Sequence, residues 1–301
     1  FDSISRVLEV YYAEKNIYSR IRQKSADLRR IVTTALERNQ KKYQLQQKQL
    51  KDSEKREKYK LYGELINVYG YNLEEGAKEL LAPNFYDNNK EIRIPLDPTL
   101  SPQENSQKFF DRYGKLKRTA EALDKLLQET KAEIDHLESI QNSLDIALSA
   151  DDLVQIKQEL TEYGFIKKNR SGKKEKIKSK PFHYLSSDGY DIYVGKNNYQ
   201  NDELTFKFAT GNDWWFHAKG MPGSHVIVKS KGEEMPDRVF EEAGMLAGFY
   251  SKGRDSDKIE IDYLQKKNVK KPAGSAPGFV VYYTNYSLTI HPDISHLKLI
   301  E

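Results

Sequence analysis

A regular repeat of apolar side chains over residues 109–148 constrains the fold more than any other feature of the sequence. Its members alternate spacings of four and three residues, with two polar exceptions. This pattern is typical of the seam of a coiled coil. A helix of about 40 residues is about 60 Å long, so part of the chain is expected to be elongated. The seam consists of Phe109, Tyr113, Leu116, Ala120, Leu123, Leu127, Thr130, Ile134, Leu137, Gln141, Leu144 and Leu148.

The start of this helix is marked by Ser101-Pro102-Gln103-Glu104. Serine is a favoured N-cap, proline suits the first helical position, and a glutamate three residues after the cap completes a capping box.

The partner of the seam is predicted to lie earlier in the same chain. From about Ser3 to Leu65 there is no proline and good helix formers dominate. Apolar residues such as Ile17, Ile21 and Leu28 recur there at helical spacing. The simplest arrangement is an antiparallel hairpin of the two helices. A homodimeric coiled coil, and therefore self-association, is the alternative.

Residues 68–98, between the two helices, have a different composition. Glycine and proline interrupt any helix, and two short apolar runs flank the turn-forming cluster Asp87-Asn88-Asn89-Lys90. We expect a small β-hairpin module at the tip of the arm, which either joins the helices or makes a distant contact. One more helix, about Asp151 to Phe165, completes an arm that we place at residues 1–165.

A basic linker is predicted at residues 166–181. It carries many lysines against one acid, Glu175. Such a run is either a solvated linker or a tether that contacts phosphates. The candidate nucleic-acid-binding residues in it are Lys173, Lys174, Lys176 and Lys178.

Residues 182–301 read as a compact α+β domain. A helix is predicted from Pro236 to about Lys252, with small residues that would let it pack closely on a sheet. A hairpin through Asn285-Tyr286 is expected to join the last two strands. The predicted strands are Asp191–Val194, Glu203–Phe208, Asp213–Ala218, Ser224–Lys229, Lys258–Leu264, Gly278–Thr284 and Ser287–Ile290.

A second basic cluster follows one of these strands and enters a Gly/Pro loop, with several tyrosines close by in the sequence. Lysines contact phosphates and aromatic rings stack on bases, so the cluster is compatible with RNA binding. Half-buried strand residues would explain many of the tyrosines equally well. The cluster consists of Lys266, Lys267, Lys270 and Lys271.

Residues 213–227, called the signature stretch below, contain both tryptophans of the chain and two histidines, on either side of Pro222-Gly223. It reads as strand, tight turn and strand. A catalytic Ser-His-Asp set is conceivable, but the second glycine of a nucleophile elbow is missing and no complete metal ligand set is present. We therefore predict no catalytic residue and no metal or other cofactor. Its residues of interest are Asp213, Trp215, His217, Pro222, Gly223, Ser224 and His225.

Composition narrows the functional classes. The 301 residues suffice for about two domains, and with no cysteine there is neither a disulfide framework nor a thiolate metal site. A reducing, cytoplasmic compartment fits this. No apolar run reaches the length of a membrane span and no signal peptide is visible, while the start at Phe1 suggests a fragment of a longer protein.

The signature stretch, Asp213-x-Trp215-Phe216-His217-Ala218-x3-Pro222-Gly223-Ser224-His225-Val226-Ile227, resembles that of the NFACT-R domain. Val269-Lys270-Lys271-Pro272-x-Gly274-x2-Pro277-Gly278 supports this, and so do Leu61-Tyr62-Gly63-Glu64-Leu65 and Ile94-Pro95-Leu96-Asp97-Pro98 in the first half. The resemblance covers essentially the whole chain. It is to the C-terminal half of bacterial NFACT proteins, a family also known as fibronectin-binding protein A or RqcH, with the eukaryotic relative NEMF.

The resemblance implies a non-enzymatic factor of ribosome-associated quality control. Such proteins bind the large ribosomal subunit obstructed by a peptidyl-tRNA, recruit tRNA, and direct C-terminal alanine tailing of the stalled chain. It further implies that the coiled-coil arm contacts the subunit, that NFACT-R binds RNA, and that the tRNA-binding motif lies in an upstream domain. Family members described as surface adhesins imply an alternative, the binding of host fibronectin or fibrinogen at the cell surface.

Overall fold

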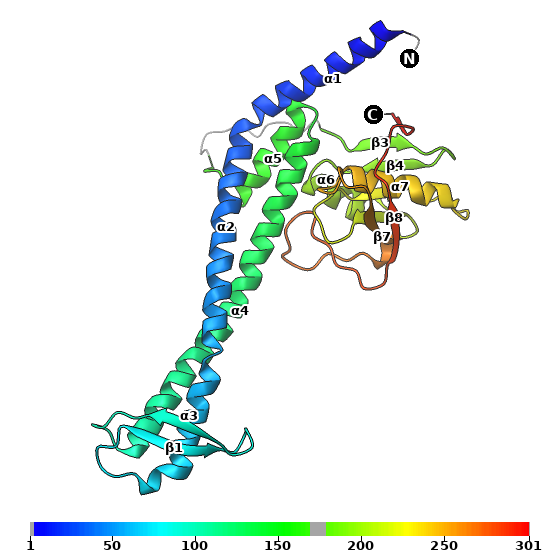
Figure 1. The fold of residues 1–301 in the computed structure, drawn as a ribbon. Coiled ribbons are helices and arrows are strands. Elements are labelled where there is room, and N and C mark those ends of the chain that lie inside the picture. Colours follow the sequence, from blue (N-terminus) through cyan, green and yellow to red (C-terminus); the bar gives the residue numbers. More distant parts are fainter. Residues whose placement is uncertain (1–2, 169–178, 301) are drawn as a thin grey trace. The chain divides into compact units, whose positions relative to one another are not determined.

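The computed structural model describes residues 3–168 and 179–300. It separates into two compact units, one of Arg38–Glu133 and the other of Phe1–Glu37 together with Ile134–Glu301. The fold has the predicted α+β class, with long helices forming a hairpin, a small two-stranded sheet and a seven-stranded antiparallel sheet with its own helices (Figure 1).

The first helical segment is divided where a single helix was predicted. A serine stands at each break: the Ser25 hydroxyl donates to the Arg22 carbonyl at 3.1 Å, and the Ser53 hydroxyl donates to the Leu50 carbonyl. Such local bonds compete with regular helical geometry and bend helices. The prediction of one helix from Ser3 to Leu65 is therefore wrong in its continuity. The three helices are α1 Ile4–Lys24, α2 Ala26–Ser53 and α3 Arg56–Tyr69.

Helix α4, Pro102–Ile146, carries the predicted seam. The capping box is present, since Ser101 Oγ accepts from the Glu104 amide at 3.3 Å and the Glu104 carboxylate accepts from the Ser101 amide at 2.8 Å. Every seam position from Phe109 to Leu144 is buried or half-buried. Leu148 was predicted as the last member, but α4 ends before it and its side chain is exposed.

The seam pairs with the first helical segment of the same chain, in the predicted antiparallel sense. Within Arg38–Glu133, α3 packs on the start of α4, where the Ser106 hydroxyl donates to the Gly63 carbonyl at 3.0 Å. In the other unit, the start of α2 packs on the end of α4, where the Arg29 guanidinium donates to the Leu144 carbonyl.

The tip module is the expected hairpin. Strands β1 Glu79–Asn84 and β2 Lys90–Pro95 pair antiparallel. The turn between them places Asn88 and Asn89 at φ of 47° and 59°, a left-handed conformation that asparagine tolerates better than most residues. One face of the hairpin packs on α3, so the module has a small core of its own, composed of Tyr62, Leu65, Ile66, Leu80, Ala82 and Ile94.

The large sheet has the strand order β8-β7-β5-β6-β4-β3-β9, and all neighbours run antiparallel. Five of the seven predicted strands are confirmed, while β3 and β9 were not predicted. The strands are β3 Phe182–Leu185, β4 Asp191–Val194, β5 Trp214–Ala218, β6 Val226–Val228, β7 Ile259–Gln265, β8 Tyr286–Ile290 and β9 Lys298–Leu299.

Two strand predictions are wrong. Residues 203–208 are helical: α6 Asn198–Glu203 continues into a π-helical turn, η2 Leu204–Phe208, because the Asn197 side chain caps α6 by accepting from the Gln200 amide. Residues 278–284 contribute only the single bridge Lys270↔Val281. Strand β8 therefore forms its ladder with β7, and the predicted hairpin through Asn285-Tyr286 is absent from the described residues.

Helix α7, Asp237–Phe249, covers one face of the sheet. As predicted, its small residues allow close packing: a Cβ on Gly244 would lie 2.8 Å from Leu288 Cδ1, and one on Gly248 would lie 2.7 Å from Ile290 Cδ1. The opposite face carries a second core, which is closed by residues of η2 and of the loop after β7.

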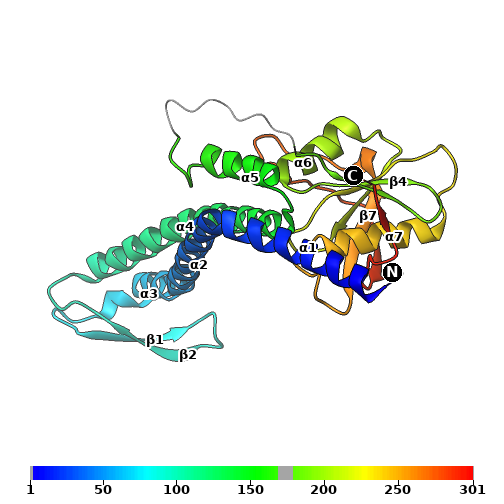
Figure 2. The same ribbon diagram turned by 90° about the horizontal axis from the view of Figure 1, so that it is seen from above.

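Helix α5, Ala150–Glu162, lies beside α6 (Figure 2). The contact is polar and buried. Glu159 accepts from Asn198 Nδ2 at 2.8 Å and contacts His136 Nε2 of α4 at 2.7 Å, and Asn197 Nδ2 donates to Gln155 at 2.8 Å. These bonds fix α6, and with it η2, against the base of the helical hairpin.

Among the helices of residues 3–168 and 179–300, none combines the length and the apolar character that crossing a bilayer requires.

Candidate nucleic-acid interface

Strand β5 sends alternate side chains to the two faces of the sheet. Trp214 and Phe216 lie on the α7 side, where the Trp214 ring meets Phe240 edge-on at 4.8 Å. Trp215 is fully buried in the second core on the opposite side, together with Ile227 and Leu264. The two adjacent tryptophans therefore belong to different layers of the domain.

Trp215 is the centre of a histidine cluster, which we define as Trp215, His217, His225 and Tyr282. The Trp215 ring stacks on His217 at 5.6 Å, and it meets His225 edge-on at 5.1 Å and Tyr282 at 5.2 Å. The two imidazoles lie perpendicular to each other at 5.6 Å. The signature stretch thus brings the half-buried His217 against the buried His225.

Both imidazoles are held in the neutral form. Burial lowers the pKa of His217 to about 4, although a hydrogen bond with the Gly223 backbone and the charge of Asp262 partly oppose this. Burial, followed by the neighbouring His217, lowers the pKa of His225 well below its ordinary value. His225 Nδ1 is also within 2.8 Å of Thr205 Oγ1. Near neutral pH these histidines add no positive charge with which to attract a phosphate.

The chain reverses direction at Lys219-Gly220, where Gly220 has φ +68°, and not at the expected Pro222-Gly223. Pro222 and Gly223 instead lie against the end of α7: the Pro222 carbonyl accepts from the Lys252 amide at 2.9 Å, and Gly223 bridges Ser251. A Cβ on Gly223 would lie 3.0 Å from that of Ser251. The Pro-Gly pair therefore serves close packing.

Ser224, Asp213 and the histidines do not form a catalytic relay. The Ser224 hydroxyl is buried and makes no hydrogen bond with the described residues. The Asp213 carboxylate accepts from Lys229, from the Ser230 amide at 2.9 Å and from the Thr210 amide at 2.7 Å. Burial raises the pKa of Asp213, but these hydrogen bonds, led by that of Lys229, outweigh it and leave the pKa below its usual value.

Asp213 also anchors the second basic cluster. Its carbonyl accepts from the Lys266 amide at 2.8 Å, and the Gly211 carbonyl accepts from the Lys267 amide at 3.2 Å. These bonds fix the short 3₁₀ turn η3, Lys266–Asn268, at the end of β7. The signature stretch thereby sets the position of the lysines.

The four lysines of this cluster have different surroundings. Lys271 pairs with Asp202 and donates to the Ala276 carbonyl at 3.1 Å, and both Lys266 and Lys271 lie 5.9 Å from the centre of the Phe206 ring. Lys267 and Lys270 are exposed, and their ammonium groups make no ion pair with the described part of the chain. These two are free to contact an anion. Lys173, Lys174, Lys176 and Lys178, the linker candidates, lie outside the described residues.

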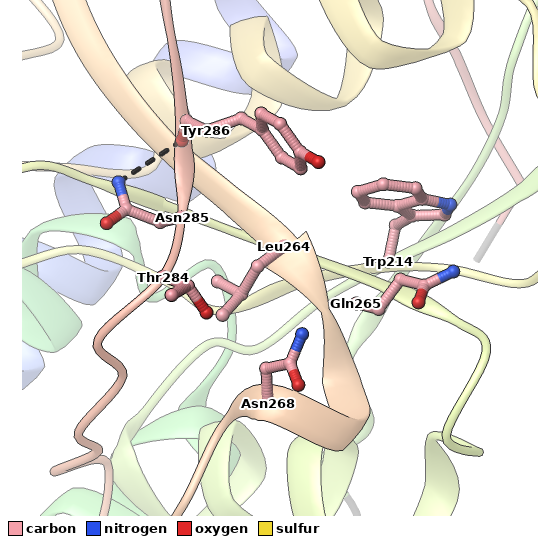
Figure 3. Close-up of a pocket in the computed structure, with 7 residues that line it drawn as sticks. All are labelled: Trp214, Leu264, Gln265, Asn268, Thr284, Asn285 and Tyr286. Carbon is pink, nitrogen blue, oxygen red and sulfur yellow. Dashed lines mark hydrogen bonds between the residues drawn. The ribbon is translucent and has the colours of Figure 1, made fainter.

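A pocket of about 400 Å³ opens beside η3 (Figure 3). Trp214 and Tyr286 project into it from β5 and β8, and Leu264 lines it from β7. The rest of its lining is polar and uncharged, namely Gln265, Asn268, Thr284 and Asn285. Sequence reasoning missed this pocket, because its residues come from three separate segments. The only local signal was the aromatic residue Tyr286 beside the lysine-rich loop.

Within the described ranges, no group of three or more histidine, aspartate or glutamate side chains is arranged to hold a metal ion.

Comparison with known proteins identifies the family. The sequence matches the model for NFACT N-terminal and middle domains over residues 1–179, and the model for the NFACT protein RNA binding domain over residues 180–282. It is 38% identical over 294 residues to the Rqc2 homolog RqcH of Streptococcus pneumoniae serotype 2 (strain D39 / NCTC 7466), covering 97% of this chain and 53% of that protein. The Rqc2 homolog RqcH of Bacillus subtilis (strain 168) is 35% identical over 297 residues, covering 97% of this chain and 52% of the relative.

A solved structure is also similar: the C-terminal part of the fibronectin/fibrinogen-binding protein from Streptococcus suis. It matches with a TM-score of 0.71 and 35% identity, covering 91% of this chain and 96% of the other. The chain spans about half the length of the curated relatives it matches. Both family models and these relatives agree, so the chain belongs to the NFACT family.

Proposed function

We propose that this chain is the RNA- and ribosome-binding part of a ribosome-associated quality-control factor, acting in the cytoplasm as a binding module and not as an enzyme. In this proposal the NFACT-R domain binds RNA, including tRNA, and the coiled-coil arm binds the large ribosomal subunit obstructed by a peptidyl-tRNA. Within the full-length protein the two together would support C-terminal alanine tailing of the stalled chain. The relatives named Rqc2 homolog RqcH support this assignment.

The observation that carries the proposal is the cationic surface at the end of β7. Lys267 and Lys270 are exposed and unpaired within the described ranges, while backbone bonds from Asp213 and Gly211 fix the turn that carries Lys266 and Lys267. A preformed surface with free ammonium groups binds phosphates by releasing their counterions. The backbone of this turn is already ordered, so it loses little conformational freedom on binding.

Aromatic side chains lie on the neighbouring segment. The bridge Lys270↔Val281 holds that segment against the lysine loop, and Phe279 and Tyr283, two residues to either side of Val281, are 52% and 84% exposed. Exposed rings next to lysines provide stacking surfaces for bases. Together the two features favour RNA over a generic acidic partner.

The first prediction is that replacing Lys266, Lys267, Lys270 and Lys271 together by glutamate weakens RNA binding by about 100-fold or more at low salt. Each lysine–phosphate contact contributes a little under one unit to the slope of log K against log salt for single strands, so the slope should decrease by roughly 3. The measurement is titration of labelled tRNA or large ribosomal subunits at about 50 and about 200 mM salt.

Two further variants make this test specific. Lys267→Glu with Lys270→Glu changes only exposed, unpaired lysines, so a loss of binding cannot be blamed on the Lys271–Asp202 pair. A matched control changes four exposed lysines elsewhere in the domain to glutamate: Lys219, Lys252, Lys258 and Lys298. If the control loses as much affinity as the quadruple variant, the binding is general charge attraction. Absence of binding by the unmodified chain at low salt would overturn the proposal.

A second candidate function is the adhesin one, favoured by the similarity to the fibronectin/fibrinogen-binding protein of Streptococcus suis. Surface plasmon resonance on immobilised fibronectin and fibrinogen tests it. Binding that persists at high salt and in the quadruple lysine variant would support an adhesin. Binding that is equal on unrelated acidic proteins would show charge attraction instead.

A further inference from the structure

The pocket beside η3 is formed by an interruption in the sheet. Strand β8 pairs with β7 only up to Tyr263↔Tyr286, and before Tyr286 the chain turns away. The last two residues of β7, Leu264 and Gln265, therefore pair with β5 alone. This leaves one edge of β7 open toward the pocket, whose volume of about 400 Å³ lies in the range of small-molecule sites.

Its aromatic walls are held from behind. The Trp214 ring packs against Phe240 at 4.8 Å and lies 5.9 Å from Tyr263, and Tyr286 stacks on Tyr263 at 5.5 Å with an interplanar angle of 30°. Tyr286 is nevertheless 64% exposed. Figure 3 shows the Trp214 and Tyr286 rings projecting toward the same space. A rigid exposed ring provides stacking area at little cost in side-chain entropy.

The polar lining is neutral, and two of its amide side chains are free to bond a ligand. The side-chain amides of Gln265 and Asn268 make no hydrogen bond with the described residues, whereas Asn285 Nδ2 donates to Asp262 at 2.8 Å. A carboxamide offers both donors and an acceptor, the combination that the edges of nucleobases present. With no charged residue in the lining, the pocket suits a neutral planar group and disfavours a phosphate or a carboxylate.

Two lysines of η3 adjoin the residues that line the pocket. Gln265 directly precedes Lys266, and Asn268 directly follows Lys267. A ligand that places a neutral ring in the pocket and an anion on η3 fits both parts. Bases in a duplex are stacked and paired, so only an unpaired nucleotide can present its ring and its base edge in this way.

We propose that this pocket binds a single unpaired nucleobase of RNA, stacked on Tyr286 and Trp214, with its edge bonded to Gln265 and Asn268 and its phosphate on Lys267. This rests on the proposed RNA-binding function. The pocket supplies a preference for single-stranded RNA, and the lysines supply affinity that is independent of strandedness.

The test compares three probes of equal length and charge per strand: single-stranded RNA, duplex RNA, and a strand with abasic riboses. Tyr286→Ala and Asn268→Ala should each weaken single-strand binding by about 10-fold, the scale of one base–aromatic stack, with the salt slope and duplex binding unchanged. Tyr286→Phe, which keeps the ring, should bind like the unmodified chain. The abasic strand has no base to stack on Tyr286, so its affinity should be the same for the unmodified chain and for Tyr286→Ala.

Intrinsic fluorescence provides a second readout. Trp215 is fully buried, so quenching by single-stranded RNA reports on Trp214 at the pocket. Circular dichroism confirms that each variant is folded. If the unmodified chain binds RNA, but the abasic strand binds equally well and Tyr286→Ala changes nothing, the pocket proposal is overturned and RNA binding stands. If the unmodified chain binds none of the probes at low salt, both proposals fail.

Discussion

Trp215→Ala is expected to destabilise the domain of residues 180–300 by about 3–5 kcal/mol, the cost of truncating a large buried aromatic side chain. The ring is fully buried and contacts His217, His225 and Tyr282. Its removal would leave a cavity in the small second core, whose boundary on one side is the π-helical turn η2 and not a strand. A core with so few members has little capacity to collapse around the gap.

The measurement is urea unfolding followed by tryptophan fluorescence. The chain has two tryptophans, Trp214 and Trp215, so the signal reports on this domain alone, and in the variant it comes from Trp214. The indole nitrogen of Trp215 makes no hydrogen bond with the described residues. Trp215→Phe should therefore lose packing area but no hydrogen bond and cost much less. An unchanged midpoint for Trp215→Ala would contradict a structural role for this residue.

The second prediction is that acidification from pH 7 to pH 5 destabilises the same domain, with His217 contributing at most about 2 kcal/mol. The unfolded chain protonates this imidazole near pH 6.5, but in the fold its pKa is about 4. Between these values the unfolded state binds a proton that the folded state does not. The stability is thus fully present above pH 6.5 and is lost as the pH falls toward 4. The pKa of His225 is lowered too, so it acts in the same direction.

The expected result is a fall in the unfolding midpoint between pH 7 and pH 5, again followed by tryptophan fluorescence. Replacing His217 and His225 by asparagine should flatten this profile, whatever it does to stability at pH 7. Replacing the exposed His291 and His296 by glutamine is the matched control and should leave the profile as steep as before. A double asparagine variant as steep as the unmodified chain would show that carboxylates dominate the acid response.

The sequence predicts an element well where the spacing of its apolar residues and a local feature, such as a cap, indicate the same structure. The seam of α4 and its Ser101–Glu104 capping box agree, and so do the spacing and the small residues of α7. Residues 203–208 failed because alternation of Leu204, Phe206 and Phe208 imitates a strand, whereas the Asn197 cap upstream starts a helix. Asparagine is common both in turns and at helix N-caps, so Asn197 alone did not indicate a helix start.

The candidate site divides in the same way. The sequence pointed to the signature stretch and to Lys266–Lys271, but the backbone bonds that join them are tertiary and carry no local pattern. It also could not show that His217 stacks on Trp215, or that His225 meets the same ring edge-on, on the face away from α7. The pocket exists because β8 stops pairing with β7 at Tyr286, and the pattern of apolar residues does not indicate where that pairing ends. The boundaries at 1–165, 166–181 and 182–301, and the linker lysines, stay predictions.

At the edge of the large sheet opposite β8, the first and last strands of the domain lie side by side. Strand β3, the first of the sheet, pairs with β9, the last, through Tyr184↔Leu299 and Leu185↔Lys298. The first and last residues of the domain therefore lie close together. A domain with neighbouring termini can be inserted into another protein, or attached at one end of it, without disturbing the core of either. Joining the two ends by a short linker and opening the chain in the exposed loop at Lys231-Gly232 should yield a circular permutant that keeps both the lysine loop and the pocket intact.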